Sequence, residues 1–569
     1  MRPTIDPHER PNSMTGAMIR MAGAGLTILL LLLGGLAAQE AATARPRETA
    51  RPHDRAQSPA DKARTSEKTE KTERPSEKPS EKDRDKDSTK AKERTTPAAE
   101  KEPVVTHHRV KIGESEIRYT ATAGLMPILD AKGEPEARIF FMAYTRDDAG
   151  PSTSRPLLFS FNGGPGSSSV WLHMGALGPR RVAMPDGPTI PAPPYHLVDN
   201  DATWLDCCDL VFIDPVGTGY SRAAKPELNS KFHSLRGDIA SVGEFIRMYL
   251  TRYDRWTSPL FVIGESYGTT RAAGLSGHLL DDGIALSGVI LVSCALDYQG
   301  FITRPGNDLA FLNYLPSYAA SAWYHKRLPD DLQRLELPAL LKEVEAWVDR
   351  EYTVILARGD RLTDNDRHAA AERLARYTGL KVDDIEDHEL RIDSSFFRGR
   401  LLRSQHRSIG RYDARYRGIE NRGPSADGVP GNDPSYDAVH AAYTTTFNHY
   451  VRDELGYKSD VTYNILGGGV GRWDYQTNMG YPATTSQLRE ALSQNPHMRV
   501  LIASGYFDLA TPYRAVEHSV AGLGLDPSIR GNIAVEYFKA GHMMYLHGPS
   551  LKKLKHDGAA LIERAITKK

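Results

Sequence analysis

The sequence PLFVIGESYG, residues 259–268, is the part of the chain that says most about its fold. Its apolar run, 259–263, is typical of a buried strand, and the residues after Gly268 are compatible with a helix. A Cβ at Gly264 or Gly268 would collide where such a helix packs against the strand, so both positions favour glycine. A GxSxG pattern alone occurs by chance in many chains. The strand, turn and helix around it therefore carry the prediction that Ser266 is a nucleophile.

An acid and a histidine follow Ser266 in the chain order that an α/β-hydrolase fold requires. Asp508 lies in SGYFDLATP (504–512), after a strand-like apolar run, where a carboxylate would orient a histidine ring. His542 lies in KAGHMM (539–544), after a second such run, and would act as general base. Taken singly, Asp508 would be interpreted as a helix N-cap and His542 as an ordinary loop histidine. Together and in this order they predict a catalytic triad with Ser266.

A glycine-rich loop, FNGGPGSSS (161–169), follows another apolar stretch. Adjacent glycines after a strand let backbone N–H groups approach a substrate, so we expect an oxyanion hole here. The N–H of Tyr267, the residue after the nucleophile, would be the second donor. The loop lacks the GK[ST] ending and the GxGxxG spacing of nucleotide-binding loops, which disfavours a phosphate site. Trp171 and His173 follow the loop and could face substrate, although core packing is the favoured use of the tryptophan.

Five blocks in one order resemble the serine carboxypeptidase family: the glycine-rich loop, DLVFIDPVGTGYS (209–221), GESYG, SGYFDLATP and AGHMM. They cover residues 157 to about 551, and the long segment between GESYG and SGYFDLATP shows no matching motif. The resemblance implies an α/β-hydrolase fold with a mostly parallel central sheet flanked by helices. It also implies no cofactor and a peptide substrate with a free C-terminal carboxylate. The implied roles are Ser266, Asp508 and His542 as the triad, Gly164 and Tyr267 as oxyanion donors, and Asn162 and Glu265 as ligands of the substrate carboxylate.

The expected role of Glu265 has a consequence for pH. A carboxylate beside a bound substrate carboxylate would be repelled, so Glu265 should share a proton with the substrate. We therefore expect acidic conditions to favour peptide hydrolysis, and turnover to weaken as the pH rises above neutrality.

The chain departs from the family at positions near the substrate. Family members usually have a tryptophan two residues before the asparagine of the loop and an acidic residue two before the following Gly-Pro. Ser160 and Ala176 stand there instead, which leaves exopeptidase selectivity open. Ser167 replaces a cysteine that is common in eukaryotic members. None of these positions belongs to the triad.

The first residues are typical of an export signal, with Arg20 before an apolar core (26–33) and the small residues of GGLAAQEA (34–41). We expect residues 1–40 to direct export, to the periplasm or out of the cell, with a retained membrane anchor as the alternative. Residues 41–103 are nearly free of aromatic and large aliphatic side chains, which predicts a disordered charged linker. The chain has 72 basic and 72 acidic residues, so it shows no charge bias toward nucleic acid.

The rest of the chain is long enough for one large α/β domain with an insertion. Its opening alternates apolar and polar residues, as antiparallel edge strands do. The hydrolase domain is predicted to comprise residues 104–297 and 461–569. Residues 298–460 are charged and helix-prone, and we expect a mainly helical cap. Continuous apolar runs predict buried parallel strands at 156–161, 210–213, 260–263 and 288–292.

No structural or catalytic metal is expected. The acidic spacing of GDRLTDNDRHAAAE (359–372) faintly resembles a calcium loop but lacks the central glycine, which favours a helix start. Only three cysteines are present, Cys207, Cys208 and Cys294, and a bridge from one of the first two to Cys294 is left open.

Three functions fit these observations. In the first, an exported serine carboxypeptidase, Ser266 attacks the terminal peptide carbonyl, His542 moves the proton and Asp508 orients the histidine. The second keeps the site but hydrolyses esters or transfers acyl groups, and Ser160 and Ala176 give it weight. The third is a non-catalytic cell-envelope binding protein. It is least favoured, because a scaffold has no need of nucleophile, base and acid together. The sequence carries no signal for an oligomeric state.

Overall fold

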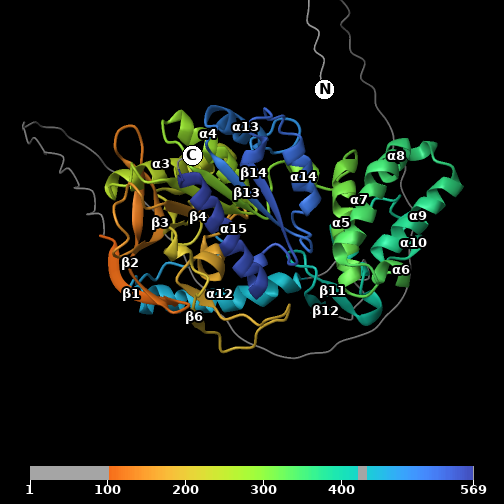
Figure 1. Cartoon of the computed structure of the whole chain (residues 1–569), viewed down its shortest axis with the longest axis horizontal. Helices are drawn as coiled ribbons and strands as arrows, with labels where there is room; N and C mark the ends of the chain where they lie inside the picture. Colours follow the sequence, from red (N-terminus) through yellow and green to blue (C-terminus); the bar gives the residue numbers. More distant parts are fainter. Residues whose placement is uncertain (1–101, 421–431, 568–569) are drawn as a thin grey trace, which may run out of the picture. The chain divides into compact units, whose positions relative to one another are not determined.

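The computed structural model describes residues 102–420 and 432–567 (Figure 1). The predicted export signal, 1–40, and all but the last two residues of the predicted linker, 41–103, lie outside these ranges. Among the residues described, no helix has both the length and the apolar character needed to cross a membrane.

A ten-stranded mixed sheet forms the centre of the fold, in the order β1-β2-β3-β7-β4-β9-β10-β13-β14, with β8 paired to β3. From β7 to β14 all neighbours are parallel. β1, β2 and β3 form an antiparallel edge that joins β7. This arrangement confirms the predicted fold class. The strands are β1 Val104–Ile112, β2 Ser115–Leu129, β3 Pro135–Arg146, β4 Leu157–Phe161, β7 Asp209–Ile213, β8 Arg222–Ala223, β9 Leu260–Glu265, β10 Gly288–Val292, β13 Arg499–Gly505 and β14 Ile533–Phe538.

The parallel strands are continuously apolar because both faces of the sheet are covered. Every residue of β4, β7 and β10 is buried. Alternate side chains enter different clusters, so that Leu158 and Phe212 lie in one and Phe159 and Val211 in the other. The four apolar runs that predicted parallel strands correspond to β4, β7, β9 and β10 within two residues at each end.

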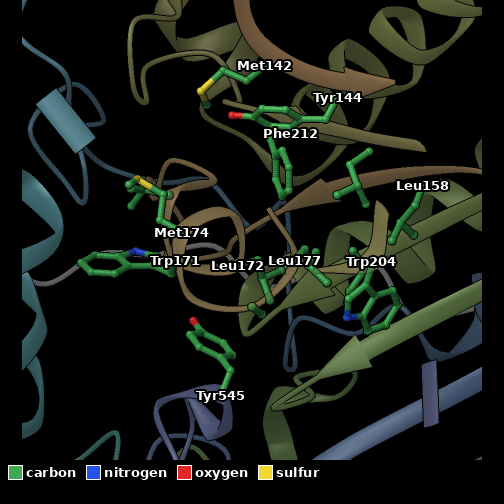
Figure 2. Close-up of a cluster of buried hydrophobic side chains, with 14 of the residues drawn as sticks. Met142, Tyr144, Leu158, Trp171, Leu172, Met174, Leu177, Trp204, Phe212 and Tyr545 are labelled. Atoms are coloured by element: carbon green, nitrogen blue, oxygen red, sulfur yellow. The ribbon is translucent and has the colours of Figure 1, made fainter. Parts of the chain in front are cut away.

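Helices cover the two faces. Side chains of α3, α4 and α13 join the Phe159 cluster, and those of α12 and α15 join the Leu158 cluster. Figure 2 shows part of the Leu158 cluster, in which Leu158, Phe212, Trp171, Leu172 and Trp204 are labelled. The bounds of these helices, with those of the short helices α1 and α2 and of α14, are α1 Val170–Leu172, α2 Asn229–Phe232, α3 Leu235–Arg252, α4 Tyr267–Asp281, α12 Pro434–Asp453, α13 Thr485–Gln494, α14 Tyr513–Ala521 and α15 Gly548–Ile566.

The predicted cap segment contains a group of helices packed around a hydrophobic cluster that includes Leu340, Trp347 and Leu374 and also takes in Phe507 and Tyr513 from outside the segment. These helices, green and teal in Figure 1, lie beside α14 at one end of the sheet, and α5 contacts α14. Their bounds and those of a short hairpin are α5 Asp308–Tyr324, α6 Asp330–Gln333, α7 Leu337–Trp347, α8 Thr353–Arg358, α9 Asp364–Thr378, α10 Val382–Glu386, α11 Ser394–Arg400, β11 Arg407–Ile409 and β12 Arg417–Ile419. A second hairpin pairs β5 Arg180–Val182 with β6 Leu197–Asp199.

Two further observations bear on the sequence predictions. Helix α12 lies in the predicted cap segment, but Val439 and Phe447 pack in the cluster on the face of the sheet. Cys207, Cys208 and Cys294 are all described and all carry free thiols, so the disulfide that the sequence left open is not formed.

Candidate active site

Ser266 occupies the turn between β9 and α4. Its backbone has φ 60° and ψ −129°, a conformation that costs free energy in a residue with a side chain and is typical of functional turns. A Cβ at Gly264 would overlap the carbonyl oxygen of Gly268, so the turn requires glycine there. The amide of Ser266 donates to the carbonyl of Val292 at 3.0 Å, which ties the turn to β10.

The glycine-rich loop lies directly against this turn. A Cβ at Gly163 would overlap the backbone nitrogen of Tyr267, so only glycine permits the close approach. Tyr267 is the first residue of α4, and its N–H therefore has no acceptor within the helix. Gly164 lines two cavities together with Ser266, Tyr267 lines the larger one, and the role of Gly164 and Tyr267 as oxyanion donors stays a prediction.

Asp508 and His542 form a buried pair. The His542 Nδ1 atom lies 2.7 Å from Asp508 Oδ2, and both side chains are buried. Asp508 also accepts hydrogen bonds from the amides of Ala510 and Thr511, at 2.7 and 3.0 Å, and from the Thr511 hydroxyl at 2.8 Å. With Nδ1–H donating to the carboxylate, Nε2 of His542 is left to accept a proton.

A residue that no motif revealed holds the histidine loop. The His542 amide donates to the carbonyl of Tyr412 at 2.6 Å, and the two rings lie 5.1 Å apart. The Ser293 hydroxyl donates to the carbonyl of His542 at 2.6 Å. Tyr412 comes from the segment before α12, whose sequence carries no recognisable signal for such a role.

Ser266 and His542 meet at a cavity of about 70 Å³, whose walls also include Asn162, Glu265, Trp171 and Arg411. No hydrogen bond joins the Ser266 hydroxyl to the His542 ring among the described contacts. The nucleophile and the base therefore face one space, and the bond between them stays a prediction.

Asn162 and Glu265 bring unpartnered polar atoms to this cavity. Both side chains are buried, and Nδ2 of Asn162 and Oε2 of Glu265 form no hydrogen bond of standard geometry among the described residues. The Asn162 and Tyr545 side chains nevertheless lie close enough to the Glu265 carboxyl to act on its pKa. The other amide atom of Asn162, Oδ1, accepts from the Leu172 amide at 3.1 Å, which orients Nδ2. Buried polar groups without partners are rare in native proteins and suit a polar ligand.

The titration of the two ionisable groups beside Ser266 is shifted. Burial raises the pKa of Glu265 from 4.5 to about 7, against the influence of His542, Tyr545 and Asn162. Burial lowers the pKa of His542, but the charge and hydrogen bond of Asp508 outweigh it, and the pKa lies above 6.5 overall. Perturbed groups in a cavity are typical of catalytic sites.

The remaining predicted positions divide between cavity and core. Trp171 lines the smaller cavity and donates to the Ser167 hydroxyl at 2.8 Å, so it does reach the site. His173 is buried, and its Nε2 lies 2.7 Å from the Tyr144 hydroxyl, so it does not face substrate. Ser160 and Ala176 are fully buried and line neither cavity beside Ser266.

A second and larger cavity, of about 600 Å³, opens beside Ser266 and Tyr267. Three arginines line it, Arg304, Arg398 and Arg411, and sequence reasoning identified none of them. In the part of the chain that the structure describes, no cluster of three or more His, Cys, Asp or Glu side chains has the arrangement of a metal site.

A sequence profile of the family described as serine carboxypeptidase matches residues 114–532. The chain belongs to the serine carboxypeptidase family. The matched region contains Ser266 and Asp508 and ends before His542.

Individual relatives align over shorter regions. Pheromone-processing carboxypeptidase KEX1 of Saccharomyces cerevisiae is 31% identical over 156 residues, which cover 26% of this chain and 20% of that protein. Serine carboxypeptidase-like 36 of Arabidopsis thaliana is 32% identical over 142 residues, 24% of this chain and 27% of that protein. These alignments thus span about a fifth to a quarter of the curated relatives. The crystal structure of KEX1(delta)P, a prohormone-processing carboxypeptidase from S. cerevisiae, gives a TM-score of 0.49 at 18% identity and covers 78% of this chain and 90% of that chain.

Proposed function

We propose that the protein is an exported serine carboxypeptidase that removes C-terminal residues from peptides through an acyl-enzyme. The observation that carries this proposal is the buried Asp508–His542 pair, 2.7 Å apart, whose histidine lines the same cavity as Ser266. Membership of the family supports the reaction class. Export is supported by the sequence of residues 1–40 alone.

The proposed reaction gives each of these groups one role. The Ser266 hydroxyl oxygen attacks the carbonyl carbon while Nε2 of His542 takes its proton, and Asp508 stabilises the imidazolium. The N–H groups of Gly164 and Tyr267 receive the negative charge on the carbonyl oxygen. His542 then returns the proton to the leaving nitrogen as the peptide bond breaks. Water, activated by His542, attacks the ester carbon and releases the shortened peptide from Ser266.

The exopeptidase character rests on Asn162 and Glu265. Their unpartnered Nδ2 and Oε2 atoms suit the two oxygens of a terminal carboxylate, one as an amide donor and the other through a shared proton. Burial of Glu265 raises its pKa to about 7, so that the carboxyl is neutral over the range in which it would donate.

Ester hydrolysis or acyl transfer is the second candidate. Ser160 and Ala176 stand at the two positions where members of the family usually have side chains that help to bind the substrate carboxylate. In this structure neither side chain lines the cavity. The carboxylate is therefore held by fewer groups, which favours substrates without one.

A comparison of three substrates tests the proposal. We expect a blocked dipeptide with a free C-terminus to be hydrolysed much faster than its C-terminal amide, because only the acid engages Asn162 and Glu265. A simple ester of the same acyl group measures the chemistry at Ser266 alone. Equal values of kcat/KM for acid and amide would refute the exopeptidase, and hydrolysis of the ester only would favour the second candidate.

A further inference from the structure

The larger cavity beside Ser266 is rich in positive charge. Its volume is about 600 Å³, and its ionisable lining consists of Arg304, Arg398 and Arg411, one carboxylate, Asp393, and tyrosines. Burial raises the pKa of Tyr314, a tyrosine of this wall, to about 12, so it contributes no negative charge near neutral pH. Phe301, Ile302 and other apolar groups complete the wall.

Asp393, the one carboxylate of the wall, forms no ion pair with the arginines. Oδ1 of Asp393 accepts hydrogen bonds from the amides of Ser395 and Phe396, at 2.8 and 3.1 Å, and so caps α11. Within the described residues, no ion pair within 4.0 Å joins Arg304, Arg398 or Arg411 to an acid. Burial lowers the pKa of Arg411, but Tyr412, Tyr314, Asp508 and Asp433 outweigh it, so the charge of Arg411 is partly compensated.

Arg398 is the arginine that most clearly lacks a partner. Its Nε is buried with no hydrogen-bond partner in the described structure. Burial lowers the pKa of Arg398, and the like charge of Arg411 acts in the same direction against the attraction of Asp433. Arg304 is placed differently, because it lies at the exposed rim, where it donates to the Tyr481 hydroxyl at 2.7 Å and stacks on that ring. Arg398 is half-buried and has no acid of the described residues within ion-pair distance, so an anion in the cavity would stabilise its charge beyond the longer-range attraction of Asp433.

The position of His542 indicates which part of a substrate each cavity binds. His542 must give its proton to the leaving nitrogen, so the departing residue lies on the side that His542 lines, in the smaller cavity. His542 does not line the larger cavity, whereas Tyr267, Ala510 and Thr511 do. The larger cavity therefore receives the acyl side of the scissile bond, and Arg411, which lines both, stands at their boundary.

We propose that the larger cavity binds an acidic side chain on the residue whose carbonyl is attacked, the penultimate residue of the peptide, through Arg398 with Arg411 and Arg304. The inference rests on the proposed carboxypeptidase function and names its substrate class. Arginine donates two parallel hydrogen bonds to a carboxylate, which suits a glutamate or aspartate side chain.

The test compares two blocked dipeptides that share a C-terminal leucine and differ only in a penultimate glutamate or glutamine. At pH 6.5 the glutamate side chain is ionised, and the two substrates have nearly the same shape. We expect kcat/KM for the glutamate peptide to exceed that for the glutamine peptide by roughly 10- to 100-fold, the range that hydrogen bonds to charged groups provide.

Variants of the arginines test whether they cause the preference for the glutamate peptide. Arg398→Gln should bring the ratio of the two kcat/KM values close to one, and Arg398→Lys, which keeps the charge, should restore part of it. Arg334→Gln is a matched control, because Arg334 is exposed and pairs with Asp330 outside the cavity. It removes the same charge and should leave the ratio unchanged. If Arg398→Gln does not fold, Arg304→Gln at the exposed rim should lower the ratio severalfold.

The outcomes separate this inference from the function on which it rests. Hydrolysis of the glutamine peptide at the same or a higher rate would overturn the acidic preference and leave the carboxypeptidase standing. A preference for glutamate that survives Arg398→Gln and Arg304→Gln would also overturn it. Failure to hydrolyse either peptide would overturn the proposed function and the inference with it.

Discussion

Asp508 engages both of its carboxylate oxygens in hydrogen bonds before any substrate binds. Oδ1 accepts from two backbone amides, and Oδ2 accepts from Thr511 and faces Nδ1 of His542. The carboxylate therefore has a fixed orientation, and so has the ring beside it. Sequence order predicted this pair, whereas Thr511, which lies next to both, gave no signal of its own.

Replacing Asp508 by asparagine tests the orienting role. The amide cannot both keep these backbone hydrogen bonds and accept from Nδ1–H as well as the carboxylate does, so the wrong tautomer of His542 should be favoured. We expect kcat to fall by about 10³- to 10⁴-fold with the fold retained. Asp526→Asn is the matched control, because Asp526 accepts similar turn hydrogen bonds from Ser528 on the surface. A loss smaller than tenfold in Asp508→Asn would contradict the triad.

The pKa shifts at Glu265 and His542 predict a pH profile limited on both sides. The general base must be neutral, so kcat/KM should fall as the pH drops below the pKa of His542, which lies above 6.5. Glu265 must be protonated to share its proton with a substrate carboxylate, so kcat/KM for a peptide acid should fall as the pH rises through about 7.

An ester substrate and one variant separate the two limbs of this profile. The ester lacks the carboxylate and should keep the acid limb of His542 while losing the fall near pH 7. Glu265→Gln should remove the same fall for the peptide acid. A profile for the acid that stays flat to pH 9 would contradict the role of Glu265. The acid limb, set by the raised pKa of His542, is a limit that the sequence did not reveal.

At the scale of the elements, the turn between β9 and α4 was predictable because its determinants are local. Gly264 and Gly268 flank Ser266 in the sequence, and the same residues meet in space. The part of the site around His542 depends instead on contacts between segments that are distant in the sequence. Tyr412 accepts the hydrogen bond of the His542 amide and lies in a stretch without a recognisable motif. Its role is therefore visible in the structure but not in the sequence.

Two glycine-to-alanine variants test the geometry of the turn. In Gly264→Ala the added Cβ would overlap the backbone of Gly268, and we expect the free energy of unfolding to fall by about 3 kcal/mol, together with loss of activity. Gly277→Ala, on helix α4, which follows the turn, places its Cβ 3.6 Å from Gln487, an ordinary contact. It should leave stability unchanged or raise it by about 0.5–1 kcal/mol. Equal denaturation curves for the two variants would contradict the tight turn.

At the scale of the whole molecule, hydrophobic patterning predicted the sheet but not the arrangement of the segment between β10 and β13. The parallel strands are read directly from apolar runs, because both faces of the sheet are covered. Helix α12 is an element whose packing partner could not be predicted in this way. Its composition placed it in the predicted cap, whereas Val439 and Phe447 pack against the face of the sheet. The sequence of an amphipathic helix shows that one face is buried, but it does not show which element covers that face.

Labelling with an organophosphonate tests whether Ser266, His542 and Asp508 act as one catalytic unit. The reagent forms a bond between phosphorus and the oxygen of an activated serine, and peptide mass spectrometry locates the adduct. We predict one adduct per chain on the peptide that contains Ser266, formed far more slowly in His542→Gln. Absence of an adduct, or an adduct on another serine, would show that Ser266 is not the nucleophile of such a unit.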